Sequence, residues 1–276
     1  ALIATRRFAV NEKKSETTNG KMPIIFIGHG SPMNAIEDNT YTQALNRVGQ
    51  ILPQPKAILM ISAHWMTNGT WVTHMKDPKT IHDFYGFPQE LFEVNYPAPG
   101  NPELAEKISH LITNPKISLD ENDWGLDHGT WAVLKHVYPK ANIPIVQLSL
   151  DMTKPAEFHF ELGKKLNSLR NQGVLIMGSG NIVHNLRRIR WEENAKPFDW
   201  ALEFDEWSKK NISDRNFNEM IHNHLKSESG RLSVPTPDHY YPLLYILGAS
   251  DDKDPIHFDY EGMQNGSISM RSVRFG

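Results

Sequence analysis

The sequence predicts an α/β fold built on parallel strands. Two short apolar runs, at 23–27 and 57–62, flank a helical pattern at 39–52. This strand–helix–strand order within about forty residues is typical of a βαβ unit, whose two strands are parallel. Two further apolar runs, at 143–150 and 174–177, again alternate with helical patterns. Runs this apolar predict strands that are buried on both faces, as in a parallel sheet.

Local signals define the other elements along the chain. Asn101-Pro102-Glu103 begins a helix that we expect to reach about Thr113, because Asn caps a helix well and Pro suits its first turn. Residues 77–101 are rich in proline and predict a long loop, a kind of segment that often acts as a lid. The remaining expected elements are a strand at 70–75, helices at 127–138, 155–170, 181–189, 197–211, 216–228 and 238–247, and a last strand at 267–275.

The first 21 residues differ from the rest of the chain. They contain an Arg pair but no apolar run after it, so we expect a flexible extension rather than a signal peptide. No repeat or linker interrupts residues 22–276, which predict a single catalytic domain. No apolar run approaches the roughly 18 residues of a membrane span, and the default expectation is a cytoplasmic enzyme.

Composition excludes several kinds of site. The formal net charge of -3 gives no global basic field for nucleic acid or for an acidic membrane, and we interpret the local cluster of Arg187, Arg188 and Arg190 as a solvated surface. The absence of cysteine excludes disulfides, thiolate nucleophiles, iron–sulfur clusters and cysteine-based zinc sites. Any metal must therefore be bound by nitrogen and oxygen, and the 13 histidines supply suitable donors.

Three histidines fall at the carboxyl ends of predicted parallel strands. His29 and His64 directly follow the first two strands, and His184 lies one short turn beyond the strand at 174–177. Sites in open α/β sheets form at this edge, so we expect these side chains to meet. A single histidine at such a position is commonly a capping or packing residue; the coincidence of three is what predicts a metal site.

Two more histidines and two aromatic residues complete the candidate site. His239 enters an apolar helical segment, where a titratable ring needs a metal or a hydrogen-bond partner. His128 begins another helix, whose dipole keeps an imidazole neutral. Trp65 and Tyr240 are each adjacent to a key histidine, and we expect them to wall a pocket for a flat ligand. The other eight histidines are expected to have surface or core roles.

Seven short motifs, in order along the chain, carry a resemblance to a known family. They are Gly-His-Gly-Ser-Pro (28–32), Ser-Ala-His-Trp (62–65), His-Asp-Phe-Tyr-Gly-Phe-Pro (82–88), Tyr-Pro-Ala-Pro-Gly (96–100), Leu-Asp-His-Gly-Thr-Trp (126–131), Gly-Ser-Gly-Asn-Ile-Val-His-Asn-Leu (178–186) and Asp-His-Tyr-Tyr-Pro-Leu (238–243). Together they resemble the 4,5-DOPA extradiol dioxygenase family, a branch of the class III, LigB-type extradiol ring-cleavage dioxygenases. The resemblance implies a three-layer α/β/α fold, of the phosphorylase/hydrolase-like kind, with a mixed, largely parallel central sheet.

The resemblance also implies a reaction and roles for the histidines. The reaction would cleave the ring of a catechol such as DOPA with O2 to a muconic semialdehyde. His29, His64 and His239 would bind the metal. His184 would be either a fourth ligand or the catalytic base, and His128 would line the oxygen and substrate pocket.

The identity of the metal is left open. Relatives that cleave protocatechuate use two histidines and a glutamate for non-haem Fe(II), whereas the matching position here is His239. We expect one divalent ion, Fe(II) for dioxygenase activity, but an all-histidine site also suits Zn(II). Two alternatives follow: a zinc-dependent hydrolase on the same fold, or a non-enzymatic metal-binding protein. The expected partners are a small catechol and O2, with no nucleic acid or membrane, in a monomer or small homo-oligomer.

Overall fold

A computed structural model describes residues 20–192 and 195–276, so nearly all of the expected extension at 1–21 lies outside the described residues. Within these ranges, eight strands form one sheet in the order β4-β3-β5-β2-β6-β1-β10-β7. A separate pair, β8 (Met263–Gln264) and β9 (Ile268–Ser269), is antiparallel. The strands of the large sheet are β1 (Ile24–Gly28), β2 (Ala57–Thr67), β3 (Thr70–Thr73), β4 (Ile117–Asp120), β5 (Ile145–Asp151), β6 (Val174–Gly180), β7 (Ile256–Tyr260) and β10 (Ser272–Phe275).

The sheet is mixed and its centre is parallel, which confirms the predicted sheet type. β5, β2, β6 and β1 run parallel to their neighbours in this group, while β3 and β10 join it antiparallel on either side. The two strands of the first βαβ unit, β1 and β2, are parallel but not adjacent, because β6 lies between them. The carboxyl ends of β1, β6 and β2 therefore meet at one edge of the sheet.

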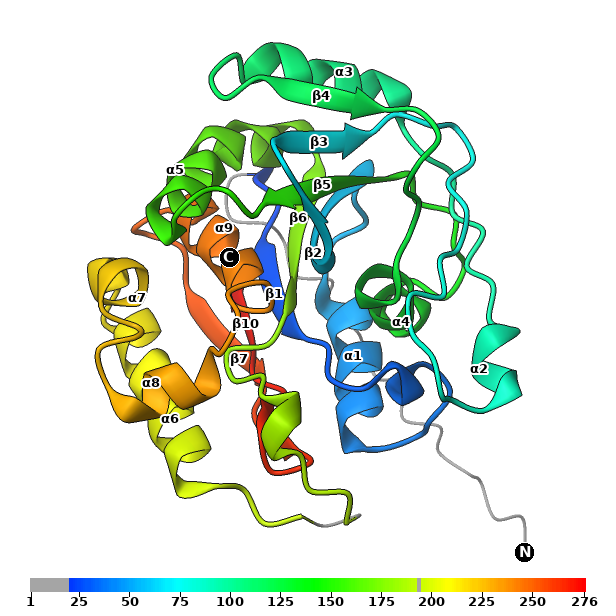
Figure 1. Cartoon of the computed structure of the whole chain (residues 1–276). Helices are drawn as coiled ribbons and strands as arrows, with labels where there is room; N and C mark the ends of the chain where they lie inside the picture. Colours follow the sequence, from blue (N-terminus) through cyan, green and yellow to red (C-terminus); the bar gives the residue numbers. More distant parts are fainter. Residues whose placement is uncertain (1–19, 193–194) are drawn as a thin grey trace, which may run out of the picture.

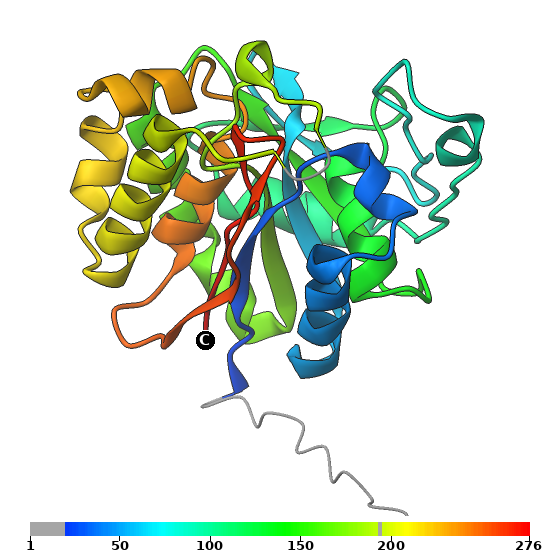
Figure 2. The same ribbon diagram turned by 90° about the horizontal axis from the view of Figure 1, so that it is seen from below.

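Helices cover both faces of the sheet, giving the three layers that the family resemblance implied (Figures 1 and 2). Ile25 and Ile27 of β1 pack in the core beneath α1 (Thr40–Ile51) and α4 (His128–Val137). Ile24 and Phe26 point the other way, into the core formed with α5 (Ala156–Leu166) and α9 (Tyr241–Ala249). This alternation of fully buried side chains explains why the strand is apolar throughout.

The remaining helices are short or lie outside these layers. α6, α7 and α8 pack beyond α9, on the side coloured yellow in Figure 1, and α3 lies beside β4. The 77–101 segment is largely irregular, as predicted, with one short helix, α2. No described helix is long and apolar enough to cross a membrane. The bounds are α2 (Gln89–Phe92), α3 (Pro102–Leu111), α6 (Asp199–Ser213), α7 (Phe217–His222), α8 (Glu228–Ser233), and 3-10 helices at Pro32–Ala35, Asn167–Gln172 and Leu186–Arg188.

Some predicted boundaries were wrong. The helix expected at 181–189 is absent: most of this segment is irregular and ends in a 3-10 turn. Its backbone is bound to other segments instead, since the His184 N–H donates to the Ser233 carbonyl, and the Asn185 N–H donates to the Ser267 carbonyl. A backbone group that pairs outside the segment cannot also serve an i→i−4 helical bond.

Three further differences concern single elements. β2 extends to Thr67, so His64 lies within the strand, in the stretch between Ile61 and Met66 where the register with β5 shifts. The helix expected at 216–228 ends early, at His222, as α7, and a separate short helix, α8, begins at Glu228. His239 precedes α9, which begins at Tyr241.

Candidate metal centre

Five histidines meet at the carboxyl end of the central strands. His29 follows β1, His64 lies near the end of β2, and His184 follows β6, while His128 begins α4 and His239 precedes α9. The ring centroid of His29 lies 5.1, 5.6 and 5.2 Å from those of His64, His128 and His239. The His184 ring is stacked on that of His239, with centroids 3.5 Å apart. The structure thus brings together all five histidines that the sequence singled out.

Two of these rings have the spacing of metal ligands. The Nε2 atoms of His29 and His64 lie 3.2 Å apart. Two imidazole nitrogens bound to one ion at about 2.0–2.1 Å lie about 2.9–3.4 Å from each other, for angles between octahedral and tetrahedral. The observed distance falls within this range, so His29 and His64 fit a shared metal ion.

A third ligand can come from either of two histidines. Ligand nitrogens of His29, His64 and His128 all lie within 4.8 Å of one another. The ring centroid of His239 is 5.2 Å from that of His29 and 5.1 Å from that of His64. The described residues therefore contain a three-histidine group that can hold a metal ion, with a fourth histidine beside it.

Hydrogen bonding fixes the tautomer of His29. Its Nδ1 lies 3.0 Å from Oγ of Ser179 in β6. The Ser179 hydroxyl donates its proton to the carbonyl of Gly129, at 2.6 Å, so towards His29 it acts as an acceptor. His29 Nδ1 therefore carries the proton, and Nε2 presents its lone pair to the cluster, as a metal ligand must.

Carboxylates do the same for two other rings, and one of these carboxylates also lies near His64. Asp83 accepts from Nδ1 of His128 at 2.9 Å and lies 3.3 Å from Nδ1 of His64. Asp238 accepts from Nδ1 of its neighbour His239. Burial raises the pKa of Asp83, but the hydrogen bonds and charge of His128 outweigh it and hold the pKa below its ordinary value. The Asp83 carboxylate is therefore charged at neutral pH; it accepts a hydrogen bond from the His128 ring and lies within ion-pair distance of the His64 ring.

The cluster favours neutral imidazoles. Burial lowers the pKa of His29, His64 and His184 well below the ordinary value of 6.5, and repulsion from neighbouring histidines lowers each further. A cluster of rings in a low-dielectric site cannot hold several protons at once. Neutral rings are the form that binds metal, so no proton has to be displaced near neutral pH.

Two glycines permit the close packing around the rings. A Cβ on Gly180 would collide with the carbonyl oxygen of His239, and one on Gly129 would press against Ser62 and the ring of His64. Because glycine lacks this atom, the end of β6 and the start of α4 can approach the histidine-bearing segments.

Trp65 and Tyr240 are not brought into the cluster. Trp65 stacks on Trp124, with ring centroids 5.8 Å apart. Tyr240 is 1% exposed, and its hydroxyl donates to the carbonyl of Met220 in α7 at 2.9 Å. Their role as pocket walls stays a prediction, and these contacts give it no support. Phe84 stands closer, edge-on to His128 with centroids 5.5 Å apart.

The residues that sequence reasoning missed are the partners of the histidines. Asp83 lies in the long loop that was expected to be functional, but a lone aspartate there has no pattern to mark it. Ser179 is a small polar residue in an otherwise apolar strand, which is a signal that could have been used. Asp238 directly precedes His239 in the motif at 238–243, and this adjacency is a signal that could have been used.

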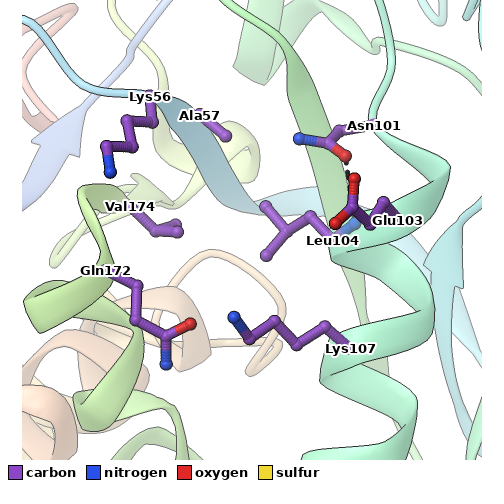
Figure 3. A pocket seen from close by; sticks show the side chains of 8 residues that line it. All are labelled: Lys56, Ala57, Asn101, Glu103, Leu104, Lys107, Gln172 and Val174. Atoms are coloured by element: carbon purple, nitrogen blue, oxygen red, sulfur yellow. Dashed lines mark hydrogen bonds between the residues drawn. The ribbon is translucent and has the colours of Figure 1, made fainter.

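A pocket lies at the opposite end of the sheet, where β2 and β6 begin (Figure 3). Lys56 and Lys107 reach into it from two sides, and the remaining lining residues come from the starts of β2 and β6, the 3-10 helix before β6, and the first turns of α3 with its N-cap. It contains no histidine. Its lining residues are Lys56, Ala57, Asn101, Glu103, Leu104, Lys107, Gln172 and Val174.

Residues 23–276 match the family model described as "Catalytic LigB subunit of aromatic ring-opening dioxygenase". The chain belongs to the LigB family. This LigB chain is 50% identical over 258 residues to "4,5-DOPA dioxygenase extradiol" of Escherichia coli K12, covering 93% of this chain and 95% of that protein. It is 35% identical over 256 residues to the protein of the same name from Beta vulgaris, covering 91% and 95%.

A solved structure has the same fold. The crystal structure of uncharacterized protein JW3007 from Escherichia coli K12 superposes with a TM-score of 0.82 at 46% identity, covering 93% of this chain and all of that one. The LigB match and the names of the relatives show that the chain is an extradiol ring-cleavage dioxygenase.

Proposed function

We propose that this dioxygenase cleaves the aromatic ring of a catechol such as DOPA with O2, using one divalent metal ion, to give a muconic semialdehyde. One observation carries the proposal: in a family of aromatic ring-opening dioxygenases, the Nε2 atoms of His29 and His64 face each other at 3.2 Å, and a ligand nitrogen of His128 lies within 4.8 Å of ligand nitrogens on both rings. The names of the relatives from Escherichia coli and Beta vulgaris support DOPA as the first substrate to test.

His29, His64 and His239 would hold the metal. The first two have the ligand spacing described above, and His239 has its Nδ1 bound to Asp238, which leaves Nε2 as a donor. Fe(II) suits this nitrogen donor set and, when bound, supplies open positions for catechol and O2 and the electron transfer between them. The buried protein shell around the rings limits the access of water to this chemistry.

His184 would act as the base that removes a proton from the catechol. Its ring is only partly buried, and the described residues give it no hydrogen-bond partner. Burial holds its pKa below 6.5, so the ring is neutral and able to accept a proton near pH 7. Stacking on His239 keeps the ring beside the proposed metal ligand without occupying either nitrogen.

His128 and Phe84 would position the substrate. Nδ1 of His128 is bound to Asp83, so Nε2 is left to accept a hydrogen bond from a catechol hydroxyl. Phe84, edge-on to His128, offers an apolar surface for an aromatic ring. A flat, apolar molecule with two adjacent hydroxyls matches this combination.

The test is oxygen consumption by protein reconstituted anaerobically with Fe(II). We expect DOPA to trigger uptake of one O2 per catechol and formation of a yellow product into which both atoms of 18O2 are incorporated, apart from exchange of the aldehyde oxygen with water. The two possible products, from 4,5- and 2,3-cleavage, are isomers of equal mass, so the absorption and NMR spectra of the product distinguish them. A panel of catechols that elicits no uptake from the iron-loaded protein would overturn the proposal.

Zinc provides the matched comparison, because the all-histidine donor set suits Zn(II) as well. The zinc-loaded protein should consume no O2, since Zn(II) has no redox chemistry. Hydrolysis of esters or amides by the zinc form under anaerobic conditions, with no oxygen uptake by the iron form, would instead support a zinc-dependent hydrolase.

A further inference from the structure

We propose that Asp83 is a positioning residue that fixes two histidines of the centre at once, His64 and His128, and so makes the 81–92 loop part of the metal site. The inference rests on the proposed function for the role of the metal. The arrangement of Asp83 and the two rings stands apart from it and can be measured without any metal.

Asp83 accepts two hydrogen bonds from His128 and lies beside a ring nitrogen of His64. Oδ1 accepts from the backbone N–H of His128 at 2.9 Å, and Oδ2 accepts from Nδ1 of the same residue at 2.9 Å. Oδ2 also lies 3.3 Å from Nδ1 of His64. The rings of His64 and His128 are 3.9 Å apart between centroids. One side chain from the loop therefore sets the orientation of a ring on β2 and a ring on α4.

The residues on both sides of Asp83 in the sequence are anchored by contacts with other segments. His82, before it, has Nε2 2.9 Å from the carbonyl oxygen of Val94, and Phe84, after it, packs against the rings of Phe92 and Trp131. Trp131 also donates from Nε1 to the carbonyl of Ile81 at 2.8 Å. The Asp83 side chain is 14% exposed. A side chain anchored in this way can transmit the position of the loop to both rings.

The chemistry of the carboxylate determines which ring nitrogen faces the centre. As an acceptor it keeps the proton on Nδ1 of His128 and leaves the Nε2 atom of this ring with a lone pair. Beside His64, whose Nδ1 lies 3.3 Å away, the negative carboxylate favours the same tautomer when Nε2 binds a metal ion. An asparagine has the same size but only one accepting atom. Whichever way its amide turns, an NH2 group faces either the N–H of His128 or the two Nδ1 atoms. The second arrangement favours the opposite tautomer, in which Nε2 carries a proton and cannot bind metal.

The experiment compares Asp83→Asn and Asp83→Ala with the wild-type chain. Glu106→Gln is the matched control, because Glu106 also contacts a histidine, His74, at 3.0 Å, but on the surface. Zn(II) affinity is measured by competition with a chromophoric chelator. The tautomers of 15N-labelled histidines are read by NMR in the metal-free protein, and circular dichroism checks the fold.

We expect both Asp83 variants to bind Zn(II) about 10–100-fold more weakly, the usual effect of losing a carboxylate behind a metal-binding histidine. Asp83→Asn should also shift His128 from the Nδ1–H towards the Nε2–H tautomer, while Glu106→Gln changes neither reading. Unchanged tautomers and affinity in folded Asp83→Asn, or in Asp83→Ala if the first does not fold, would overturn the inference. A wild-type chain that bound no metal would refute the proposed function, and the tautomers would still decide the role of Asp83.

Discussion

His184 differs from the four histidines around it because the described residues leave its ring without a hydrogen bond. The rings of His29, His128 and His239 are each bound at Nδ1, to Ser179, Asp83 and Asp238. A bound Nδ1 fixes which nitrogen faces the centre, which a metal ligand needs, whereas a base must exchange its proton freely. This difference supports the role of base for His184 and not for the rings fixed at Nδ1. All are histidines, so the residue type alone could not have distinguished these roles.

Replacing His239 and His128 one at a time tests which of them is the third ligand. We expect His239→Ala to lower the bound metal well below one ion per chain. His128→Ala should keep the metal and lower kcat by about 10²–10⁴-fold, a common effect of losing a group that takes part in proton transfer. Metal content after gel filtration and oxygen uptake by the reconstituted proteins give the two readings. The reverse result, with metal lost only from His128→Ala, would assign the third ligand to His128.

At the scale of helices and strands, apolar periodicity predicted the buried centre of the fold. β1, β5 and β6 are buried along their whole length, and their apolar sequences predict them as strands. β4 and β7 were missed because they are half-exposed edge strands, Ile-Ser-Leu-Asp and Ile-His-Phe-Asp-Tyr, with mixed sequences. Edge strands depend on pairing to one neighbour, which a local pattern does not reveal.

The candidate site was predictable to a similar extent, and for a similar reason. Histidines at the ends of β1, β2 and β6 could be grouped, because parallel strands end at a common edge. Asp83 could not be added, since its contact with His128 joins positions 45 residues apart through a loop without regular structure. Tyr240 was expected beside His239 as its chain neighbour, but its side chain points towards α7.

The start of α1 gives a prediction at this scale. The Asn39 side chain accepts from the N–H groups of Tyr41 and Thr42, and the Thr42 hydroxyl accepts from the Asn39 N–H, which forms a capping box. We expect Asn39→Ala to lower the free energy of unfolding by about 1 kcal/mol. Urea denaturation measures the change.

Asn46→Ala is the control for this helix, because Asn46 is exposed within α1 and alanine is the better helix former. This variant should be as stable as the wild-type chain or slightly more stable. Equal stability of Asn39→Ala and the wild-type chain would show that the capping bonds are replaced by water at no cost.

Over the whole molecule, the histidines join segments that are far apart in sequence. His29 and His239 are separated by 210 positions, and the rings between them come from β2, α4 and the segment after β6. The site therefore exists only in the folded chain. The free energy needed to keep these crowded rings neutral lowers the stability of the folded state.

The pH dependence of stability follows from this crowding. The pKa of His29, His64 and His184 is lowered well below 6.5, and burial lowers that of His159, in the other core, to about 4. Below pH 6.5 the unfolded chain binds protons that the folded chain does not. The free energy of unfolding of the metal-free protein should fall as pH drops from 7 to 5, by about 1.4 kcal/mol per unit for each histidine that stays neutral.

Urea denaturation at several pH values checks this slope. His159→Phe removes one buried histidine that lies outside the cluster. The free energy of unfolding of this variant should therefore change less steeply with pH, by the contribution of one histidine. A free energy of unfolding that stays constant between pH 7 and 5.5 would contradict the expectation.

The segment that carries His184 is held from the far end of the chain. The Ser269 N–H donates to the Val183 carbonyl at 2.9 Å, Asn181 donates from Nδ2 to the Ser269 carbonyl at 2.8 Å, and the Ser267 carbonyl binds Asn185. A ribosome makes a chain from its N-terminus, so His29, His64 and His128 emerge long before residues 267–269. A chain that is still being synthesised can expose these three histidines to stray metal ions. The complete centre cannot form until residues 267–269 have been made. Placement of His184 beside the other histidines is therefore a late step, which follows synthesis of residues 267–269.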